Sequence, residues 1–380
     1  MTDRKPDQTR FDTSAVGSAQ VVVSVRDFAA NLTFFRDRLG FRLDAIYPAD
    51  HPRRATLSGY GLMLALRQAE RDDVLTLRLI LRGSAVPPNR EAVEAPNGSR
   101  IEFAAEEPTI ELPDNVPEFV LSKLDARTPW GEGRAGMRYR DLIPNRQGGR
   151  FIASHIRIVE PGPVPDYVHF HRVRFQLIYC YKGWARLVYE DQGKPFIMRA
   201  GDCVLQPPQI RHQVLESGDG LEVVEVACPA DHETLADPSL ALPTGNLDSS
   251  RQFAGQRFVF HQARKAQWSP WRMDGFEARD LGIAAATDGL LSAQVVRPRA
   301  EPSAQALTHH GEFLFLFVLG GGLQLDTASS GVHRLTDGDC VTIPAAACHR
   351  LSDCDPSLEF LEIQVGAKLP TAPCELHAEA

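Results

Sequence analysis

An internal repeat limits what this chain can fold into more than any other feature of its sequence. One copy contains Pro129-Trp130, Arg140-Asp141-Leu142 and Gly201-Asp202-Cys203-Val204, and the other contains Pro270-Trp271, Arg279-Asp280-Leu281 and Gly338-Asp339-Cys340-Val341. The period of roughly 140 residues is too long for a solenoid and has the length of a domain. A chain of 380 residues therefore contains a duplicated domain and has room for a further one.

Each copy is rich in short apolar runs broken by Gly, Pro, Asp and Asn, and few segments show a helical period. This pattern predicts a mainly β fold with two antiparallel barrels or jelly rolls packed side by side. The first barrel is expected over residues 118–235 and the second over 257–368. Residues 236–256, which are rich in Pro and Gly, are expected to connect them.

Three histidines of the first copy are spaced as metal ligands. His169 and His171 flank Phe170, and because a strand alternates its faces, both imidazoles project to the same side. His212 follows on a later strand, after the Gly201-Asp202 turn and a Pro-Pro step. Three imidazoles that converge inside a small barrel form a site for a single divalent metal ion.

The order and spacing of these residues resemble the two motifs of the cupin family. Seven positions fit those motifs: Gly162, His169, His171, Gly183, Gly201, Pro207 and His212. Two positions depart from them, because Gln176 stands where the family usually has a Glu ligand and Gln209 where it usually has Gly. The resemblance covers roughly residues 118–368 and implies a bicupin, with two double-stranded β-helix barrels.

The second copy has lost part of the histidine set. If Gly321 matches Gly183, the four ligand positions are filled by Leu307, His309, Leu314 and His349. If the register shifts by one, the first three are filled by Thr308, His310 and Phe315 instead. At least one histidine is missing in either register, so we expect the second barrel to be a structural partner with a degenerate site.

Gln176 suggests the chemistry of the first site. A neutral Gln is a weak ligand and more naturally hydrogen-bonds a bound water, dioxygen or substrate. Three neutral imidazoles leave the metal its full charge and open positions, which favours bidentate anionic oxygen ligands. This three-histidine face resembles the ring-cleaving and diketone-cleaving cupin dioxygenases, including the bicupin gentisate and salicylate types.

The resemblance implies a mononuclear non-haem dioxygenase whose substrates are dioxygen and a small hydroxylated aromatic acid, catechol or diketone. Ferrous iron, Fe(II), is the preferred metal, and zinc, manganese or nickel are alternatives. Two other functions stay open. One is a metal-dependent isomerase or lyase without redox chemistry, and the other is a bicupin that only binds a small molecule.

Two further residues, on the strand before the histidine motif, are candidates for catalysis. His155 and Arg157 share one face, opposite Ile156 and Ile158. If that face lines the barrel, Arg157 could hold a substrate carboxylate and His155 could transfer a proton. The equal alternative is an outer, solvated face. Tyr179 and Tyr181 alternate with Ile178 and should face away from the metal, toward an interface.

The N-terminal segment has a different pattern. Strands are expected at 20–25, 41–47, 54–58, 61–66 and 75–81, and a helix at 28–39 that is capped by Asp27 and ended by Gly40. The stretch from Val25 to Phe41 resembles the βαβββ module of the vicinal oxygen chelate (glyoxalase) family. The resemblance implies an α+β module over residues 16–83 with a structural or pairing role, because Gln20 occupies a position that is often a metal His. Residues 84–117 are expected to be a linker.

Charge and cysteine usage exclude several classes. The net charge of -8 gives no electrostatic reason to bind nucleic acid, and no apolar run is long enough to cross a membrane. The polar first 15 residues and seven widely spaced cysteines predict a cytoplasmic protein without a signal peptide or a disulfide framework. We also expect a homodimer.

Overall fold

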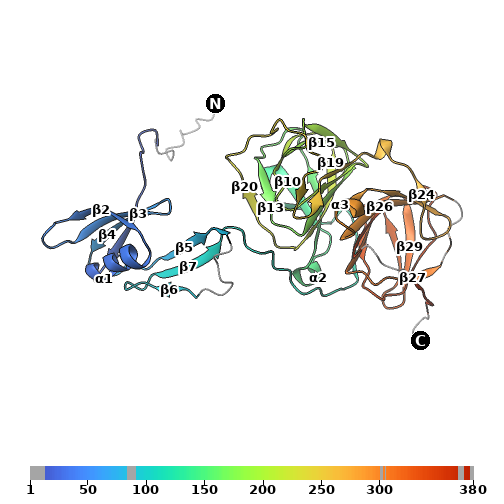
Figure 1. The fold of residues 1–380 in the computed structure, drawn as a ribbon. Helices are drawn as coiled ribbons and strands as arrows, with labels where there is room; N and C mark the ends of the chain where they lie inside the picture. The colour runs from blue at the N-terminus through green and yellow to red at the C-terminus, as the bar shows by residue number, and fades with distance from the viewer. Residues whose placement is uncertain (1–12, 84–90, 300–302, 304, 367–371, 377–380) are drawn as a thin grey trace, which may run out of the picture. The chain divides into compact units, whose positions relative to one another are not determined.

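The structure is a computed structural model that describes residues 13–83, 91–299, 303, 305–366 and 372–376. The predicted polar start up to residue 12, part of the predicted linker (84–90) and the last two residues of the predicted second barrel (367–368) lie outside the described residues. The chain divides into two compact units, residues 1–109 and 110–380 (Figure 1). None of the described helices is both long and apolar enough to cross a membrane.

The N-terminal unit contains the expected β-α-β-β-β order. Its first sheet has the strand order β1 (Val21–Val25), β4 (Leu62–Gln68), β3 (Arg54–Gly59) and β2 (Arg42–Tyr47). Helix α1 (Phe28–Thr33) begins at Asp27, whose side chain accepts a hydrogen bond from the Ala30 N–H, and continues into a π-helical turn, η1 (Phe34–Arg38). Phe35, Leu57, Leu64 and Leu66 form the core between helix and sheet.

The predicted linker is only partly a linker. A second small sheet of this unit has the order β5 (Thr76–Leu81), β7 (Arg100–Ala105) and β6 (Val93–Glu94), with β5 and β7 parallel. Residues 93–105 therefore belong to the N-terminal unit, which ends at Thr109. The prediction ended the module too early, because β7 pairs with a strand that precedes it by some twenty residues of poorly patterned sequence.

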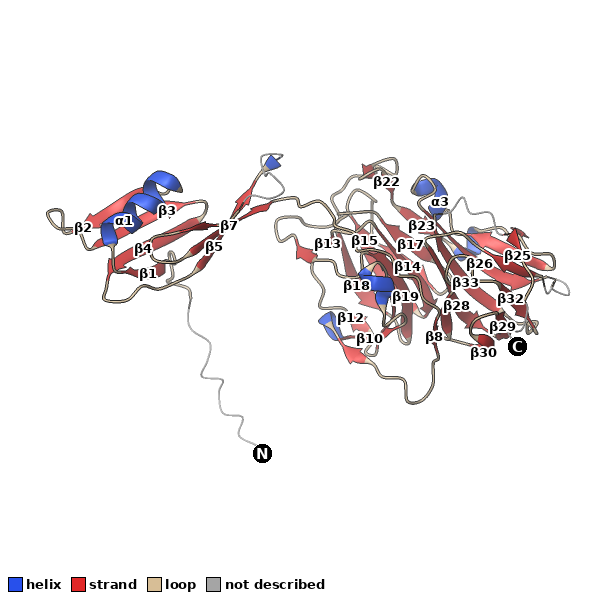
Figure 2. Ribbon diagram, turned by 90° about the horizontal axis from the view of Figure 1, so that it is seen from below, coloured by secondary structure: helices blue, strands red, loops and turns tan. Residues whose placement is uncertain are grey.

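The second unit is built from two β-barrels, each made of two facing sheets (Figure 2). The first barrel has one sheet ordered β23 (Val259–His261), β17 (Cys203–Gln206), β14 (Phe175–Lys182), β19 (Leu221–Cys228), β11 (Ile152–Ile158), β10 (Met137–Asp141) and β9 (Gly131–Glu132). Its other sheet is ordered β16 (Phe196–Arg199), β15 (Trp184–Tyr189), β18 (His212–Ser217), β13 (His169–His171) and β20 (Thr234–Ala236), with β12 (Gly162–Pro163) beside β18.

The second barrel repeats this order strand for strand. One sheet runs β24 (Ser269–Pro270), β25 (Phe276–Asp280), β26 (Leu291–Pro298), β33 (Glu359–Val365), β28 (Phe313–Gly320), β31 (Cys340–Thr342) and β8 (Val120–Ser122). The other runs β30 (Gly331–Thr336), β29 (Gly322–Thr327), β32 (His349–Ser352), β27 (Ala306–Thr308) and β34 (Ala372–Pro373). The sequence repeat is therefore a structural repeat.

Short elements complete the two barrels. The hairpin of β21 (Gln252–Phe253) and β22 (Gln256–Arg257) lies in the connecting segment. The helices are single turns: η3 (Arg134–Gly136), α2 (Arg146–Gly149), η4 (Ala263–Lys265) and α3 (Ile283–Ala286).

The barrels exchange their first strands. β8 precedes the first barrel in the chain but pairs with β31 of the second, and β23 precedes the second barrel but pairs with β17 of the first. The predicted boundaries at 118 and 257 therefore assign β8 to the first barrel and β23 to the second, although each strand pairs with the other barrel. The outer faces of the two large sheets share one core, in which Phe151 stacks on Phe313 at 4.4 Å. Tyr179 and Tyr181 lie in this core, which confirms that they face an interface.

One disulfide was not expected. Cys348 and Cys374 are bonded, while the remaining five of the seven cysteines are free. Cys203 and Cys340 are fully buried core residues. A single bridge is not a disulfide framework. It is nevertheless unexpected for the predicted cytoplasmic location, where cysteines are usually kept reduced.

Candidate metal centre

The three predicted ligands meet on two neighbouring strands of the first barrel. β13 carries His169 and His171 on one face, and β18 runs antiparallel beside it, so that His212 lies directly opposite His169. The turn before β18 places Gln209 at φ 64°, in the left-handed region that favours glycine. The strand register, rather than a loop, therefore fixes the position of the third histidine.

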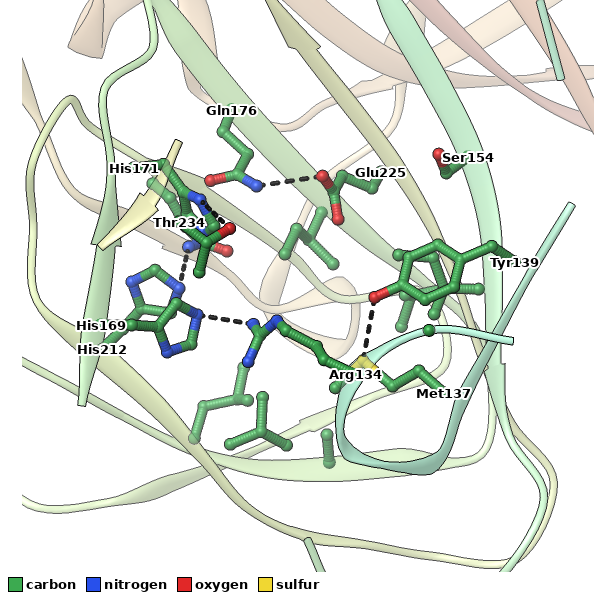
Figure 3. Close-up of a pocket in the computed structure, with 18 of the residues that line it drawn as sticks. Arg134, Met137, Tyr139, Ser154, His169, His171, Gln176, His212, Glu225 and Thr234 are labelled. Carbon is green, nitrogen blue, oxygen red and sulfur yellow. Dashed lines mark hydrogen bonds between the residues drawn. The ribbon is translucent and has the colours of Figure 1, made fainter. Parts of the chain in front are cut away.

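The histidines form one compact cluster inside the barrel (Figure 3). Their ligand nitrogens all lie within 4.8 Å of one another, and the ring centroids of His169 and His212 are 4.2 Å apart. All three side chains are buried. Among the described residues, this is the only group of three that could hold a metal ion.

The hydrogen bonds of the rings leave Nε2 as the ligand atom. His169 Nδ1 donates to the Tyr167 carbonyl at 2.7 Å, and His212 Nδ1 donates to the Ile210 carbonyl at 3.0 Å. His171 Nδ1 lies 3.2 Å from Thr234 Oγ1. Protonation at Nδ1 leaves a lone pair on Nε2, which accepts from Arg134 Nη2 at 2.7 Å in His169 and from Gln206 Nε2 at 2.8 Å in His212. A metal ion would replace these two donors, and the Nδ1 partners are of the kind that orient metal-binding histidines in proteins. The residues therefore fit a divalent metal ion.

Burial keeps the three imidazoles neutral. Desolvation lowers the pKa of His171 to about 3, with further contributions from His169, His232 and Arg134. Desolvation, followed by the other two histidines, lowers the pKa of His212 well below its usual value. The pKa of His169 is lowered by desolvation and by the nearby Arg134 charge. Neutral imidazoles are the form that binds a metal.

A cavity of about 420 Å³ opens beside the cluster. Its walls are largely apolar and belong to both sheets of the barrel, and a few polar groups converge in it. The apolar residues include Met137, Ile156, Ile158, Ile178, Leu187, Val214 and Val223. A concave apolar pocket with a small number of polar groups is the usual form of a small-molecule site.

Gln176 lies in this cavity, as the sequence predicted. It is buried on β14, and its Nε2 donates to Glu225 Oε1 at 3.0 Å (Figure 3). Its Oε1 is buried without a hydrogen-bond partner in the described structure. That unsatisfied acceptor is suited to a ligand hydroxyl or a bound water.

Arg134 is a site residue that the sequence did not reveal. Its Nη2 donates to His169 Nε2 at 2.7 Å, and its Nη1 pairs with the buried Asp166. It projects into the cavity from the turn η3, in which Ala135 has φ 54°. Glu225, Tyr139, Gln206 and His232 also line the cavity and were not predicted. Gln206 stands between the motif residues Gly201 and Pro207 at a position that the motif leaves open, and the other three lie outside both motifs. Only the closed barrel brings the four together.

The structure does not bring His155 and Arg157 into the cavity. Ile152, Ser154, Ile156 and Ile158 of β11 line it, so the alternate residues point to the opposite face. His155 is fully buried there against Phe317 of the second barrel, and Arg157 covers the Trp130 ring at 3.9 Å. The suggestion that these two residues act on substrate is corrected accordingly, and the alternative of a solvated face does not hold for His155 either.

The second barrel has no equivalent cluster among the described residues. Leu307 lies opposite His349 as His169 lies opposite His212, which settles the register in favour of Leu307, His309, Leu314 and His349. Both nitrogens of His309 are used by backbone, since Nε2 donates to the Ile343 carbonyl at 2.8 Å and Nδ1 accepts from the Gly311 N–H at 3.1 Å. His310 is exposed.

A buried carboxylate of the second barrel is paired with a partly exposed arginine, whose side chain is 22% exposed. Glu362 is buried and pairs with Arg272, and it also accepts hydrogen bonds from Gln294 and Gln364. Glu362 occupies the position of Glu225, because each lies opposite the equivalent residue of the neighbouring strand, Leu316 or Ile178. Glu312, a conceivable extra ligand, is paired with Arg150 and Arg174 instead.

Comparisons with known proteins support the fold. No protein-family model matches the chain, and no curated protein matches it. Among solved structures, salicylate 1,2-dioxygenase from Pseudaminobacter salicylatoxidans matches with a TM-score of 0.51 and 15% identity, over 69% of this chain and 90% of that chain. The same dioxygenase with gentisate matches with a TM-score of 0.50 and 15% identity, over 69% and 86%.

A mutant of Bacillus subtilis oxalate decarboxylase is similar at a TM-score of 0.49 and 13% identity, over 70% of this chain and 80% of that chain. At these identities the likeness shows the fold alone. The second unit is therefore a two-barrel cupin fold. Its first barrel carries a three-histidine cluster suited to a divalent metal.

Proposed function

We propose that the protein is a mononuclear non-haem metal dioxygenase that acts on a small, oxygen-chelating anionic substrate, such as a hydroxylated aromatic acid, a catechol or a diketone. The observation that carries this proposal is the three-imidazole cluster, without a carboxylate ligand, at the wall of a largely apolar cavity of about 420 Å³. A bound divalent ion, with ferrous iron preferred, would supply a Lewis acid that accepts a chelating oxygen anion and activates dioxygen.

The residues around the cluster fit this substrate class. The Arg134 guanidinium beside His169 can hold a substrate carboxylate or enolate by charge-assisted hydrogen bonds. The free Oε1 of Gln176 can accept a hydrogen bond from a ring hydroxyl. The apolar walls at Ile156, Ile178 and Val223 bury a ring and exclude water.

Oxygen uptake tests the proposal. The protein is reconstituted anaerobically with ferrous iron, and oxygen consumption is measured with salicylate, gentisate, catechol and a 1,3-diketone, with Gln176→Leu as a variant that keeps all three histidines. We expect uptake with at least one of these compounds and at least a roughly 10-fold lower rate in the variant. Absence of uptake with every compound, in protein shown to contain one iron per chain, would refute a dioxygenase.

One observation favours a second candidate, a non-redox isomerase or lyase. The Glu225 carboxylate faces the same cavity and has no cationic partner in the described structure, so it could move a proton on a chelated substrate. Metal analysis of protein purified without added metal separates the candidates. Zinc or manganese with no oxygen uptake would support the second, and iron with uptake the first.

For the N-terminal unit we propose a single glyoxalase-like module that pairs two chains. Its support is the order β1-β4-β3-β2 with α1 on one face, together with an exposed Gln20 in place of a metal ligand. Sedimentation equilibrium of the full chain tests this role. A dimer supports it, and a monomer at micromolar concentration contradicts it.

A further inference from the structure

The two barrels are joined by reciprocal contacts of two buried arginines. Arg140 of the first barrel donates to the Gly338 carbonyl of the second at 2.7 Å, and Arg279 of the second donates to the Gly201 carbonyl of the first at 3.2 Å. The neighbouring contacts are also paired, because the Leu124 N–H donates to Asp339 and the Ala263 N–H donates to Asp202, each at 2.8 Å. The interface therefore has two equivalent ends.

The strand register extends this equivalence to the side chains around the two arginines. Trp130 precedes β9 and is covered by Arg157 at 3.9 Å, and Trp268 precedes β24 and is covered by Arg297 at 3.8 Å. Trp130 thus corresponds to Trp268, and not to Trp271 as the sequence repeat suggested. His155 lies opposite Arg140 in the first barrel, and Val295 lies opposite Arg279 in the second. His155 therefore corresponds to Val295.

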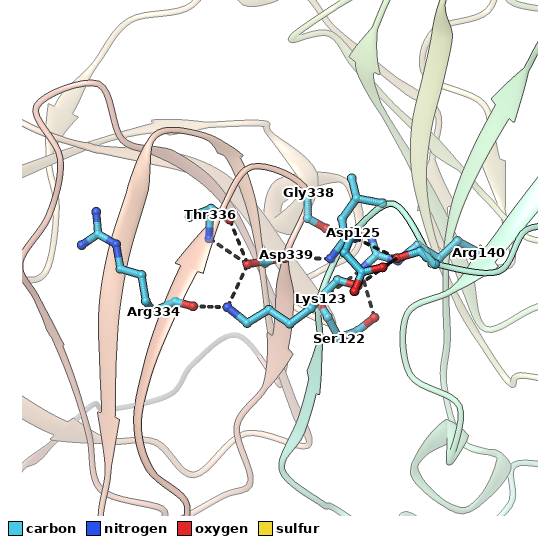
Figure 4. A network of polar contacts seen from close by, with 10 residues as sticks. Ser122, Lys123, Asp125, Arg140, Arg334, Thr336, Gly338 and Asp339 are labelled. Carbon is cyan, nitrogen blue, oxygen red and sulfur yellow. Dashed lines mark hydrogen bonds and ion pairs between the residues drawn. The ribbon is translucent and has the colours of Figure 1, made fainter.

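The end around Arg140 contains a network of polar contacts (Figure 4), and large side chains surround it. A Cβ on Gly338 would clash with Leu124. The His155 ring packs against Trp130 at 5.0 Å and against Tyr181 and Phe317 at 5.6 Å each. Arg140 also donates to the carbonyl and hydroxyl of Ser122 at 3.1 and 3.0 Å, although its Nε, like that of Arg279, is buried without a partner in the described structure.

The end around Arg279 is open. Here Ala263 replaces Leu124 and Val295 replaces His155, and both exchanges remove side-chain volume. A cavity of about 390 Å³ lies at this end, between the barrels and apart from the metal centre, and Ala263 is part of its wall. It is lined by Tyr179, Tyr181, Trp268, Leu319, Arg279 and Glu359, together with Ala263 and its neighbours.

Arg279 has unused hydrogen-bond capacity in this cavity. It is buried, with 5% of its surface exposed, yet its only acceptors in the described structure are the Gly201 carbonyl and the Tyr179 hydroxyl at 3.5 Å. Its Nε is buried without a partner, and no described carboxylate forms an ion pair with it. A guanidinium has five N–H donors, and a buried one without a carboxylate is costly. Glu359, the acidic lining residue, is 40% exposed and lies 3.8 Å from Arg297.

We propose that this inter-barrel cavity is a second ligand site, which binds a small aromatic carboxylate through Arg279. The planar guanidinium matches the two oxygens of a carboxylate. The Tyr179, Tyr181 and Trp268 rings provide the apolar surface that buries an aromatic ring. The Tyr179 hydroxyl accepts from Arg279, so its own hydrogen is free to bind the same carboxylate.

Calorimetric titration of the metal-free, full-length protein with benzoate tests the site. The titration uses an Arg134→Met background, which removes the cation of the first-barrel cavity. We expect one binding site, at least a roughly 10-fold loss of affinity when Ala263→Leu restores the bulk found at Leu124, and a similar loss with Arg279→Met. Ala285→Leu, the same substitution at an exposed position, should keep the original affinity.

Three results would overturn the proposal. One is an absence of benzoate binding in the Arg134→Met background. Another is unchanged affinity in an Ala263→Leu protein whose melting temperature matches the parent. The third is equal binding of benzylamine, which has the same ring and the opposite charge. The second and third results do not depend on whether Arg279→Met folds.

Discussion

The two barrels share one strand order but differ in what fills them. In the first, His169, His171 and His212 face a cavity, and among the described residues the carboxylate of Glu225 accepts a hydrogen bond only from the neutral Gln176. In the second, Leu307 replaces the first histidine, His309 is bonded to backbone, and Arg272 enters to pair with Glu362. A few interior side chains decide whether the same framework offers a site or a packed core.

The difference also shows how a duplicated site can be lost without loss of the fold. Removing one imidazole leaves buried polar groups that need new partners. The second barrel supplies them through the Arg272–Glu362 pair and the amides Gln294 and Gln364. The large sheet of this barrel still supports the first barrel through the shared core around Phe313, so a structural role suffices to explain why it is retained.

The largest expected effect is on metal binding. His171→Ala should lower the affinity for a divalent metal by at least roughly 1,000-fold, because only two imidazoles remain. The matched substitution in the second barrel, His309→Ala, should leave metal content unchanged. Metal content per chain, measured after dialysis, tests both expectations. Equal losses of metal in the two variants would contradict the assignment of the metal to the first barrel.

The second effect concerns stability. Glu362→Leu should lower the free energy of unfolding by about 3 kcal/mol, because it leaves the Arg272 charge partly buried without its partner. The double variant Arg272→Met/Glu362→Leu should recover most of this loss. Urea unfolding of the three proteins measures it. An unchanged free energy of unfolding in Glu362→Leu would mean that the ion pair does not stabilise the second barrel.

A smaller effect is expected on substrate affinity. Arg134→Met should weaken binding of a carboxylate-bearing substrate roughly 30-fold, equivalent to about 2 kcal/mol for a charged hydrogen bond. A phenol that lacks the carboxylate should lose little. Arg138→Met, an exposed neighbour on β10, is the control. Equal losses for the two substrates would show that Arg134 does not read the carboxylate.

The smallest effect is a pH dependence at the interface. Desolvation lowers the pKa of His155 in the folded protein, whereas the unfolded chain takes up a proton below the ordinary value near 6.5. His155 therefore makes the protein less stable as the pH falls below that value. His155→Val, which copies Val295, should remove up to about 1.4 kcal/mol per pH unit of this slope.

The measurement is the free energy of unfolding at pH 7 and pH 5.5 in both proteins. The other buried histidines titrate in both, so the difference between the two slopes isolates His155. Parallel slopes would show that His155 does not resist protonation in the folded state.

The sequence predicted the parts of the site that depend on local geometry. Strand alternation is a property of the backbone, so it placed His169, His171 and Gln176 on the inner face without knowledge of the rest of the barrel. The repeat likewise predicted two barrels with one strand order. The first prediction concerns a residue and its near neighbours in the chain, and the second needs only the comparison of two copies of one sequence pattern.

The parts that were missed depend on closure of the barrels. Arg134 enters from a turn with a left-handed residue, and Glu225 reaches the site because β19 pairs with β14. His155 was a candidate for the site because the sequence around it does not distinguish a strand face inside the barrel from a face covered by a second barrel. The exchange of β8 and β23 could not be predicted from the sequence either, because each strand pairs with the barrel of the other copy.

The most direct test is an anomalous difference map of crystals of the protein loaded with ferrous iron under anaerobic conditions. We expect a single strong peak bounded by Nε2 of His169, His171 and His212, and no peak near His309 and His349. A comparable peak in the second barrel, or none at the three histidines, would contradict the assignment of the metal to the first barrel alone.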